Sequence, residues 1–202
     1  LRASIIIGSG SLSFEMIRYL TERVPIMICP RWVYTRTQPI AIQNVLEYLT
    51  AALNVPESSG KIIEIGGARI ITYGEMMTIY AQVRGLKRIM LPVPVLTPRL
   101  SSYWVNLVTP IPAVIARPLI EGLRNENIVQ DPSARVLFPD IVPGDYFSAV
   151  KHALEQLTAS NIETTWMDAL SSSQRAVQPV LVTTQEGMVI ERRQRSVPTT
   201  DE

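Results

Sequence analysis

Apolar residues near the start of the chain fall into a short run and then into a helical spacing. Residues 5–7 form a β-branched run that ends at Gly8-Ser9-Gly10, a pattern that predicts a strand and a turn. Apolar side chains then recur at helical spacing over residues 14–24, and Ser11 or Ser13 is the expected N-cap. The chain is therefore expected to open with a strand, a turn and a helix.

The alternation of strands and helices continues along the chain. Residues 26–29 form a short extended segment between two prolines. Five apolar side chains within residues 42–53, at steps i, i+3, i+4, i+7 and i+11, predict the clearest amphipathic helix. Strands are expected at 61–65 and 88–93. Between them, Thr-Tyr-Gly-Glu at 72–75 is a capping box that predicts the start of a third helix.

Prolines crowd the next region, since residues 92–143 hold nine of the fifteen. Each proline fixes φ and removes a hydrogen-bond donor, so short helices and rigid turns are expected here. Irregular surfaces of this kind often shape a ligand pocket, and a helical cap without a ligand is an equally open alternative. Residues 145–157 return to helical spacing, and β-rich runs around residues 185–187 predict a hairpin.

Composition excludes several classes of protein. Apolar residues make up 47% and charged residues 18% of the 202 residues, which is too apolar for a disordered chain. A net charge of +1 provides no global field for nucleic acid or an anionic membrane. A single cysteine, Cys29, excludes a disulfide scaffold and a cysteine metal cluster. A single histidine, His152, argues against a multi-histidine metal site and a serine–histidine pair. Prolines and Arg117 interrupt the longest apolar stretch, 105–120, so no membrane span is expected. Together these features predict a soluble, cytoplasmic protein without a metal site.

The turn at Gly8-Ser9-Gly10 lies where a dinucleotide-binding fingerprint would start. Its third glycine is replaced by Ser13, and Arg31 lies near the place where an acidic residue is expected, ~20 positions further on. A strand-to-helix loop close to a ligand is therefore the preferred interpretation. Arginines make up 16 of the 19 basic residues, and the Arg31 guanidinium beside Trp32 suits phosphate or carboxylate. Structural ion pairs are the alternative role for such arginines.

No residue of this chain is predicted to be catalytic. The acid–base pair Tyr-x-x-x-Lys of short-chain reductases does not occur, because Tyr19 and Tyr80 are each followed four positions later by arginine. An arginine does not serve as the proton relay that the lysine provides in that pair. His152 is expected at the surface, and Cys29 is expected to be a buried, inert thiol.

Several ordered segments resemble a known family. They are Leu1-Arg2-Ala3-Ser4-Ile5-Ile6-Ile7-Gly8-Ser9-Gly10, Gln38-Pro39-Ile40-Ala41-Ile42-Gln43-Asn44-Val45, and the runs 63–67 and 72–77. In this order they resemble the C-terminal half of an extended or atypical short-chain dehydrogenase/reductase, an NAD(P)-binding group that includes sugar-nucleotide epimerases and NmrA-like proteins. The run 98–104 is similar to a bacterial subgroup of NAD-dependent epimerases or dehydratases. Gln43 and Asn44 stand where the family usually has aspartates.

The resemblance implies an α/β fold over residues 1–158. This would be the C-terminal part of a Rossmann-type NAD(P)-binding fold with a mostly helical, proline-rich substrate subdomain. Residues 159–202 would be a linker and a β-hairpin that lead to a following domain. The family's phosphate loop and Tyr/Lys pair belong to an N-terminal half that the chain does not contain. NAD or NADP is therefore expected as the cofactor of the full-length protein, and none is expected for this fragment.

The same resemblance implies the site residues. The nicotinamide would lie beside Arg2, Ser4, Gly8 and Ser9. The residues expected to bind the substrate are Ser11, Arg31, Trp32, Gln38, Arg99, Ser101, Tyr103 and Trp104. The implied function is the substrate-binding half of an NAD(P)-dependent oxidoreductase or of a nucleotide-sugar epimerase or dehydratase, acting on a phosphorylated or nucleotide-linked small molecule. The alternatives are a non-catalytic NmrA-like module that senses a dinucleotide or binds a protein, and a domain that only mediates association.

Self-association is also expected. A parallel sheet that begins at residues 5–7 would lack neighbours for that strand, and the apolar faces of the helices at 13–24 and 40–54 would meet water. Exposed edges and apolar patches drive pairing between chains. The simplest result is a homo-oligomer paired through the sheet edge, without nucleic-acid or membrane partners.

Overall fold

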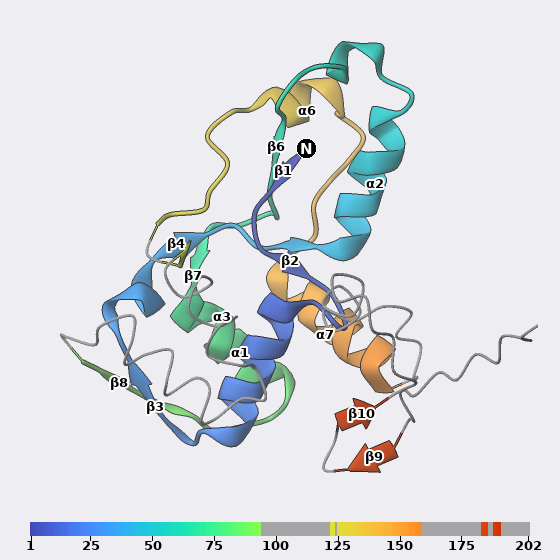
Figure 1. Ribbon diagram of the computed structural model, residues 1–202. Helices are drawn as coiled ribbons and strands as arrows, with labels where there is room; N and C mark the ends of the chain where they lie inside the picture. The colour runs from blue at the N-terminus through green and yellow to red at the C-terminus, as the bar shows by residue number, and fades with distance from the viewer. Residues whose placement is uncertain (94–121, 124, 159–182, 186–187, 191–202) are drawn as a thin grey trace, which may run out of the picture. The chain divides into compact units, whose positions relative to one another are not determined.

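The computed structural model describes residues 1–93, 122–123, 125–158, 183–185 and 188–190 (Figure 1). The chain divides into two compact units, Leu1–Glu163 and Thr164–Glu202. Of the proline-rich region 92–143, residues 94–121 lie outside the described residues, and its described part contains a short helix, Ser133–Leu137, of the kind expected there.

Strands of the first unit associate in pairs, as far as the described residues show. The parallel pairs are β1 (Arg2–Ala3) with β6 (Glu64–Ile65), β2 (Ile6–Ile7) with β5 (Ile40–Ala41), and β3 (Ile26–Cys29) with β8 (Ile89–Pro92); β4 (Arg36–Thr37) pairs antiparallel with β7 (Ile71–Thr72). Parallel strands need long crossovers. The helices α1 (Leu12–Arg23), α2 (Ile42–Ala52) and α3 (Tyr73–Val83) lie within these connections. The predicted mixed α/β fold is confirmed at this level.

The start of the chain differs from the prediction. The expected strand at 5–7 is preceded by β1, which the apolar pattern did not indicate. A main-chain hydrogen bond from Arg2 N to Ile63 O, at 2.7 Å, helps to hold β1 on its partner, so this strand depends on pairing rather than on apolar side chains. Ile7 is buried and β2 pairs with β5. The expectation that residues 5–7 lack a neighbouring strand is therefore wrong.

Helices α1 and α3 pack against each other. The Ser11 hydroxyl caps α1 as predicted, because its Oγ accepts a hydrogen bond from Phe14 N at 3.2 Å. The buried rings of Phe14 and Tyr80 meet edge to face, with 6.0 Å between their centroids. The expectation that the apolar face of the helix at 13–24 meets water is wrong, since α3 covers this face.

The capping box at the start of α3 forms as predicted. Thr72 Oγ1 accepts a hydrogen bond from Glu75 N at 3.2 Å, and Thr72 N donates to Glu75 Oε2 at 2.7 Å. Each of these two amides lies at the helix start, where no carbonyl of the helix can reach it.

Replacing both side chains of this box, Thr72→Ala with Glu75→Ala, should lower the free energy of unfolding by about 1–2 kcal/mol. Thermal denaturation followed by circular dichroism measures the loss, with Glu57→Ala at an exposed position as the control. Ligand affinity of the full-length protein should stay the same. An affinity loss at unchanged melting temperature would contradict a purely structural role.

A buried cluster lies between α2 and α6 (Ser133–Leu137). The rings of Tyr48 and Phe138 meet edge to face at its centre, 5.6 Å apart. The buried members are Ile40, Val45, Tyr48, Ile63, Ile65, Ala134 and Phe138. Helix α7 (Tyr146–Thr158) contacts α3 and β5. Only part of the apolar face predicted for the helix at 40–54 enters this core, because several of its leucines are exposed.

The second unit contains a hairpin among its described residues. Strand β9 (Thr183–Gln185) pairs antiparallel with β10 (Met188–Ile190), and Gln185 lies opposite Met188. The predicted hairpin is confirmed. In the described part of both units, no helix has the length and apolar character that crossing a membrane requires.

Candidate functional site

Two glycines end β6 and allow other segments to approach the strand closely. A Cβ on Gly66 would lie 2.8 Å from both Gln38 Cδ and Val129 Cγ2, and a Cβ on Gly67 would overlap the Pro39 carbonyl oxygen. Ligands of parallel α/β folds bind at the carboxyl ends of strands. Glycines at this end of β6 therefore bring three chain segments together where a ligand site is expected.

The Gln38 side chain fixes this junction. Its Nε2 donates to the Gly67 carbonyl at 2.7 Å, and its Oε1 accepts from Val129 N at 3.1 Å. The side chain is buried, so both main-chain groups would lack these partners without it. Sequence reasoning expected Gln38 to bind substrate, and the structure places it in the cavity wall with its amide already bonded to the chain.

Two carboxylates lie beside the junction. Glu64 Oε2 accepts from Gln130 N at 2.9 Å and from Asp131 N at 3.3 Å, while Oε1 pairs with Arg2 at 3.3 Å. The two main-chain amides, with a smaller effect from Arg2, hold the pKa of Glu64 below its ordinary value. Hydrogen bonds from Ser133 lower the pKa of Asp131 in the same way. Both groups are therefore negatively charged at neutral pH and can accept hydrogen bonds from a ligand.

A cavity of about 370 Å³ opens at this place, within the size range of small-molecule sites. Its lining comprises Gln38, Tyr48, Glu64, Ile65, Gly66, Gly67, Ala68, Ile70, Val129, Gln130, Asp131, Pro132, Ala134, Arg135 and Pro143. No hydrogen bond within the described residues uses the Tyr48 hydroxyl or the Arg135 guanidinium. Burial raises the pKa of Tyr48, so its hydroxyl stays protonated at neutral pH.

The arrangement is suited to binding rather than to proton transfer. The cavity offers hydrogen-bond acceptors at Glu64 and Asp131 and donors at Tyr48 and Arg135. The pKa of Tyr48 is raised and the pKa values of Glu64 and Asp131 are lowered, so all three move away from neutrality, which does not suit a general acid or base. In the described part of the chain, no group of three or more histidine, cysteine, aspartate or glutamate side chains could hold a metal ion.

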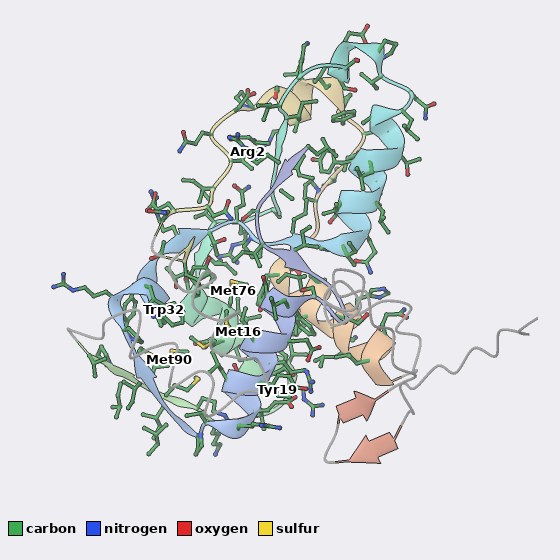
Figure 2. All side chains as sticks on the ribbon, in the orientation of Figure 1. Arg2, Met16, Tyr19, Trp32, Met76 and Met90 are labelled. Atoms are coloured by element: carbon green, nitrogen blue, oxygen red, sulfur yellow. The ribbon has the colours of Figure 1, made fainter. Side chains whose placement is uncertain are left out.

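The residues expected beside the nicotinamide have identified structural contacts. Ser4 is buried, and its hydroxyl donates to the Asn127 carbonyl at 2.9 Å and lies 3.2 Å from the Thr37 hydroxyl. Arg2 is exposed and pairs with Glu64 (Figure 2). Gly8 packs on α2, since a Cβ there would lie 2.9 Å from Ile42 Cγ2. Ser9 is half-buried in the turn after β2. Their roles toward a cofactor stay predictions.

The residues expected to bind substrate are dispersed. Ser11 caps α1 and donates its hydroxyl to the Ile6 carbonyl at 3.0 Å. Arg31 and Trp32 lie in a short 3₁₀ helix, Arg31–Tyr34, and neither lines the cavity. The Trp32 ring meets Tyr73 edge to face at 6.1 Å, in a different part of the unit from Arg2 (Figure 2). The remaining candidates, Arg99, Ser101, Tyr103 and Trp104, lie outside the described residues.

Several cavity residues were not predicted from the sequence. Tyr48 lies on the inward face of an amphipathic helix, and this position indicates packing only. Glu64 lies in the short segment that carries the resemblance, but its bonds reach 66 and 67 positions along the chain. No sequence spacing indicates such contacts.

Comparison with known proteins gives the fold. No protein family and no curated protein matches the sequence. Among solved structures, the chain resembles RMD from Pseudomonas aeruginosa complexed with NADPH, at a TM-score of 0.52 and 10% identity over 80% of this chain and 48% of that one. It also resembles the UDP-glucose 4-epimerase of Thermotoga maritima with UDP-glucose. That match has a TM-score of 0.52 and 12% identity, and it covers 80% of this chain and 46% of the epimerase. The third structure is the UDP-glucuronic acid 4-epimerase of Bacillus cereus in complex with UDP-glucuronic acid and NAD. It matches with a TM-score of 0.50 and 13% identity, over 77% of this chain and 44% of the epimerase.

The chain spans about half the length of each of these solved structures. At such identities the likeness concerns the fold alone. The described part of the chain thus has a mixed α/β structure that matches the Rossmann-like fold of these epimerases.

Proposed function

We propose that this chain is the substrate-binding half of an NAD(P)-dependent oxidoreductase or of a nucleotide-sugar epimerase or dehydratase. The observation that carries the proposal is the match of about four-fifths of the chain to about half of enzymes solved with NADPH or with a UDP-sugar. Residues 1–158 would then be the C-terminal part of the Rossmann-type domain together with its proline-rich substrate subdomain.

The cavity beside β6 supports a binding role. Donors at Tyr48 and Arg135 and acceptors at Glu64 and Asp131 suit the hydroxyl and phosphate groups of a nucleotide-linked small molecule. In this proposal Arg135 contacts an anionic part of the substrate, and the two carboxylates accept bonds from its hydroxyls. The complete protein would be a cytoplasmic homo-oligomer that uses NAD or NADP.

The described residues do not fit the pyrophosphate of such a cofactor. Among the described residues, the turn Gly8-Ser9-Gly10 before α1 links a strand to a helix N-terminus through glycines, as a phosphate cradle does. There the Ser11 hydroxyl already accepts from Phe14 N, and Ile42 fills the space beside Gly8. A dinucleotide would therefore depend on residues other than these.

A non-catalytic sensing or interaction module remains the second candidate. The observation that favours it is that both Tyr-x-x-x-Arg pairs are engaged in structural contacts. The Tyr80 hydroxyl on α3 donates to Glu22 on α1 at 2.6 Å, and Arg84 pairs with the same carboxylate. Within α1, the Arg23 guanidinium lies over the Tyr19 ring, 5.0 Å from its centroid. Burial raises the pKa of Tyr80, which removes it further from acid–base work.

Titration of the 202-residue chain with UDP-glucose and, separately, with NADPH tests the proposal. Saturation-transfer NMR should show binding of UDP-glucose, and NADPH fluorescence should show no saturable binding. Arg135→Gln should weaken UDP-glucose binding about tenfold, because a charged hydrogen bond contributes about 1.5–3 kcal/mol. Arg84→Gln, outside the cavity, is the matched control. Low-micromolar NADPH binding without UDP-glucose binding would contradict the proposal.

A further inference from the structure

Three main-chain amides in the wall of the cavity beside β6 are already occupied. Gln130 N and Asp131 N, two consecutive donors, both bond to Glu64 Oε2, at 2.9 and 3.3 Å. Val129 N donates to Gln38 Oε1 at 3.1 Å. Consecutive main-chain amides commonly bind anions in proteins. Here the Glu64 carboxylate takes the place of such an anion, so these amides are not available to an anionic group of a ligand.

The charged side chains of the cavity wall are mostly acidic. Among the described lining residues, Glu64 and Asp131 are carboxylates and Arg135 is the one cation. Hydrogen bonds hold the pKa values of both carboxyls below their ordinary values, so both are charged at neutral pH. Burial raises the pKa of Tyr48, and the positive charge of Arg135 partly opposes this effect. The Tyr48 hydroxyl and the Arg135 guanidinium therefore lie near each other and form the donor side of the cavity.

These charges distinguish two kinds of sugar that the fold does not. The epimerase solved with UDP-glucose and the one solved with UDP-glucuronic acid resemble the chain about equally, at TM-scores of 0.52 and 0.50. Their sugars differ only at the sixth carbon, which carries a hydroxyl in glucose and a carboxylate in glucuronic acid. A hydroxyl can donate a hydrogen bond to Glu64 or Asp131. A carboxylate has no proton to donate, and both side chains repel it.

We propose that the cavity beside β6 accepts nucleotide-linked sugars whose sugar is uncharged and rejects those whose sugar carries a carboxylate, with Glu64 and Asp131 as the residues that decide. This inference rests on the proposed function, because it takes the bound molecule to be a sugar nucleotide. Arg135 and Tyr48 hold the phosphate side of the ligand, and the two carboxylates accept hydrogen bonds from the sugar hydroxyls. A sugar carboxylate would meet two like charges, with the one cation engaged by phosphate and the amides of residues 129–131 occupied.

Titration of the 202-residue chain with UDP-glucose and with UDP-glucuronic acid tests this specificity. In competition experiments followed by saturation-transfer NMR at neutral pH and low salt, UDP-glucose should bind about tenfold more tightly, because like charges meet in the complex with glucuronic acid. Added salt should reduce this preference, because ions screen the repulsion. Equal affinity for the two ligands overturns the inference and leaves the proposed function standing. If neither ligand binds, the proposed function fails and the inference fails with it.

Variants that remove one negative charge test the two residues. Glu64→Gln retains an oxygen that can accept from the amides of Gln130 and Asp131, and Asp131→Asn retains one for Ser133 N, so the wall should keep its shape. Each variant should lower the preference for UDP-glucose about threefold, mainly because UDP-glucuronic acid binds more tightly. Thermal denaturation checks that each variant is folded.

The matched control is Glu126→Gln. Glu126 pairs with the exposed Arg36 much as Glu64 pairs with the exposed Arg2, but Glu126 does not line the cavity. This variant should keep the full preference for UDP-glucose. A preference that stays unchanged in both Glu64→Gln and Asp131→Asn, or that falls equally in the control, overturns the inference.

Discussion

A Gly67→Ala variant is expected to lose a large part of the stability of the first unit. The added Cβ would overlap the Pro39 carbonyl oxygen, which is main chain and not the end of a flexible side chain. Either the junction of β5 and β6 opens or the strand end shifts, and both break the bonds of Gln38. We expect a loss of about 4 kcal/mol, near the upper end for one substitution, from a total that is ~5–15 kcal/mol for ordinary domains.

Urea denaturation measures this loss, and Gly122→Ala is the matched control. A Cβ at Gly122 would meet no atom within 4 Å, and its backbone is not in the left-handed region. The control should be neutral or slightly stabilising, because alanine restricts the unfolded chain. A Gly67→Ala protein that unfolds at the urea concentration of the parent chain would show that Pro39 and Gly67 are not in contact.

Gln38→Ala is expected to lower the free energy of unfolding by about 3 kcal/mol. The substitution leaves the Gly67 carbonyl and the Val129 amide without the partners that Gln38 gives them at 2.7 and 3.1 Å. Leaving a buried donor or acceptor unpaired costs about 1–3 kcal/mol for each group. Binding of UDP-glucose should weaken as well, because the segment that carries Arg135 loses its link through Gln38 and keeps only the bonds from Gln130 N and Asp131 N to Glu64 of β6.

Gln43→Ala on the neighbouring helix is the control, since that side chain makes no hydrogen bond within the described residues. It should change stability by less than about 0.5 kcal/mol. If Gln38→Ala weakens UDP-glucose binding at an unchanged free energy of unfolding, the Gln38 side chain binds the ligand directly and does not serve to hold the cavity wall together.

Local elements could be predicted from the sequence where the determining contacts are local. The Ser11 cap and the box of Thr72 with Glu75 each join residues three positions apart, so spacing alone predicts them. The hairpin of the second unit is likewise set by neighbouring residues. β1 escaped prediction because it is two residues long and is held by main-chain bonds to a strand about 60 residues away.

The site could be predicted only in part. The resemblance indicated Gln38 and the glycines after β6, since these residues lie in ordered, recognisable segments. It did not indicate Tyr48, Asp131 or Arg135, because the cavity joins α2 and β6 with a segment that follows a long stretch of intervening chain. Arg31 and Trp32 were predicted to bind substrate because an arginine beside an aromatic ring suits an anionic ligand. The fold places neither residue in the cavity wall.

Periodicity and hydrogen bonds between near neighbours specify the helices, their caps and the mixed α/β character, so these features follow from the amino-acid order. Which apolar face is covered depends on tertiary packing. The pattern at α1 and the pattern at α2 look alike, but α3 buries Phe14 and Leu20 of α1, whereas Leu49 of α2 stays exposed. Burial depends on which element packs alongside. That choice rests on contacts between residues far apart in the chain, which the apolar period of a single helix does not contain.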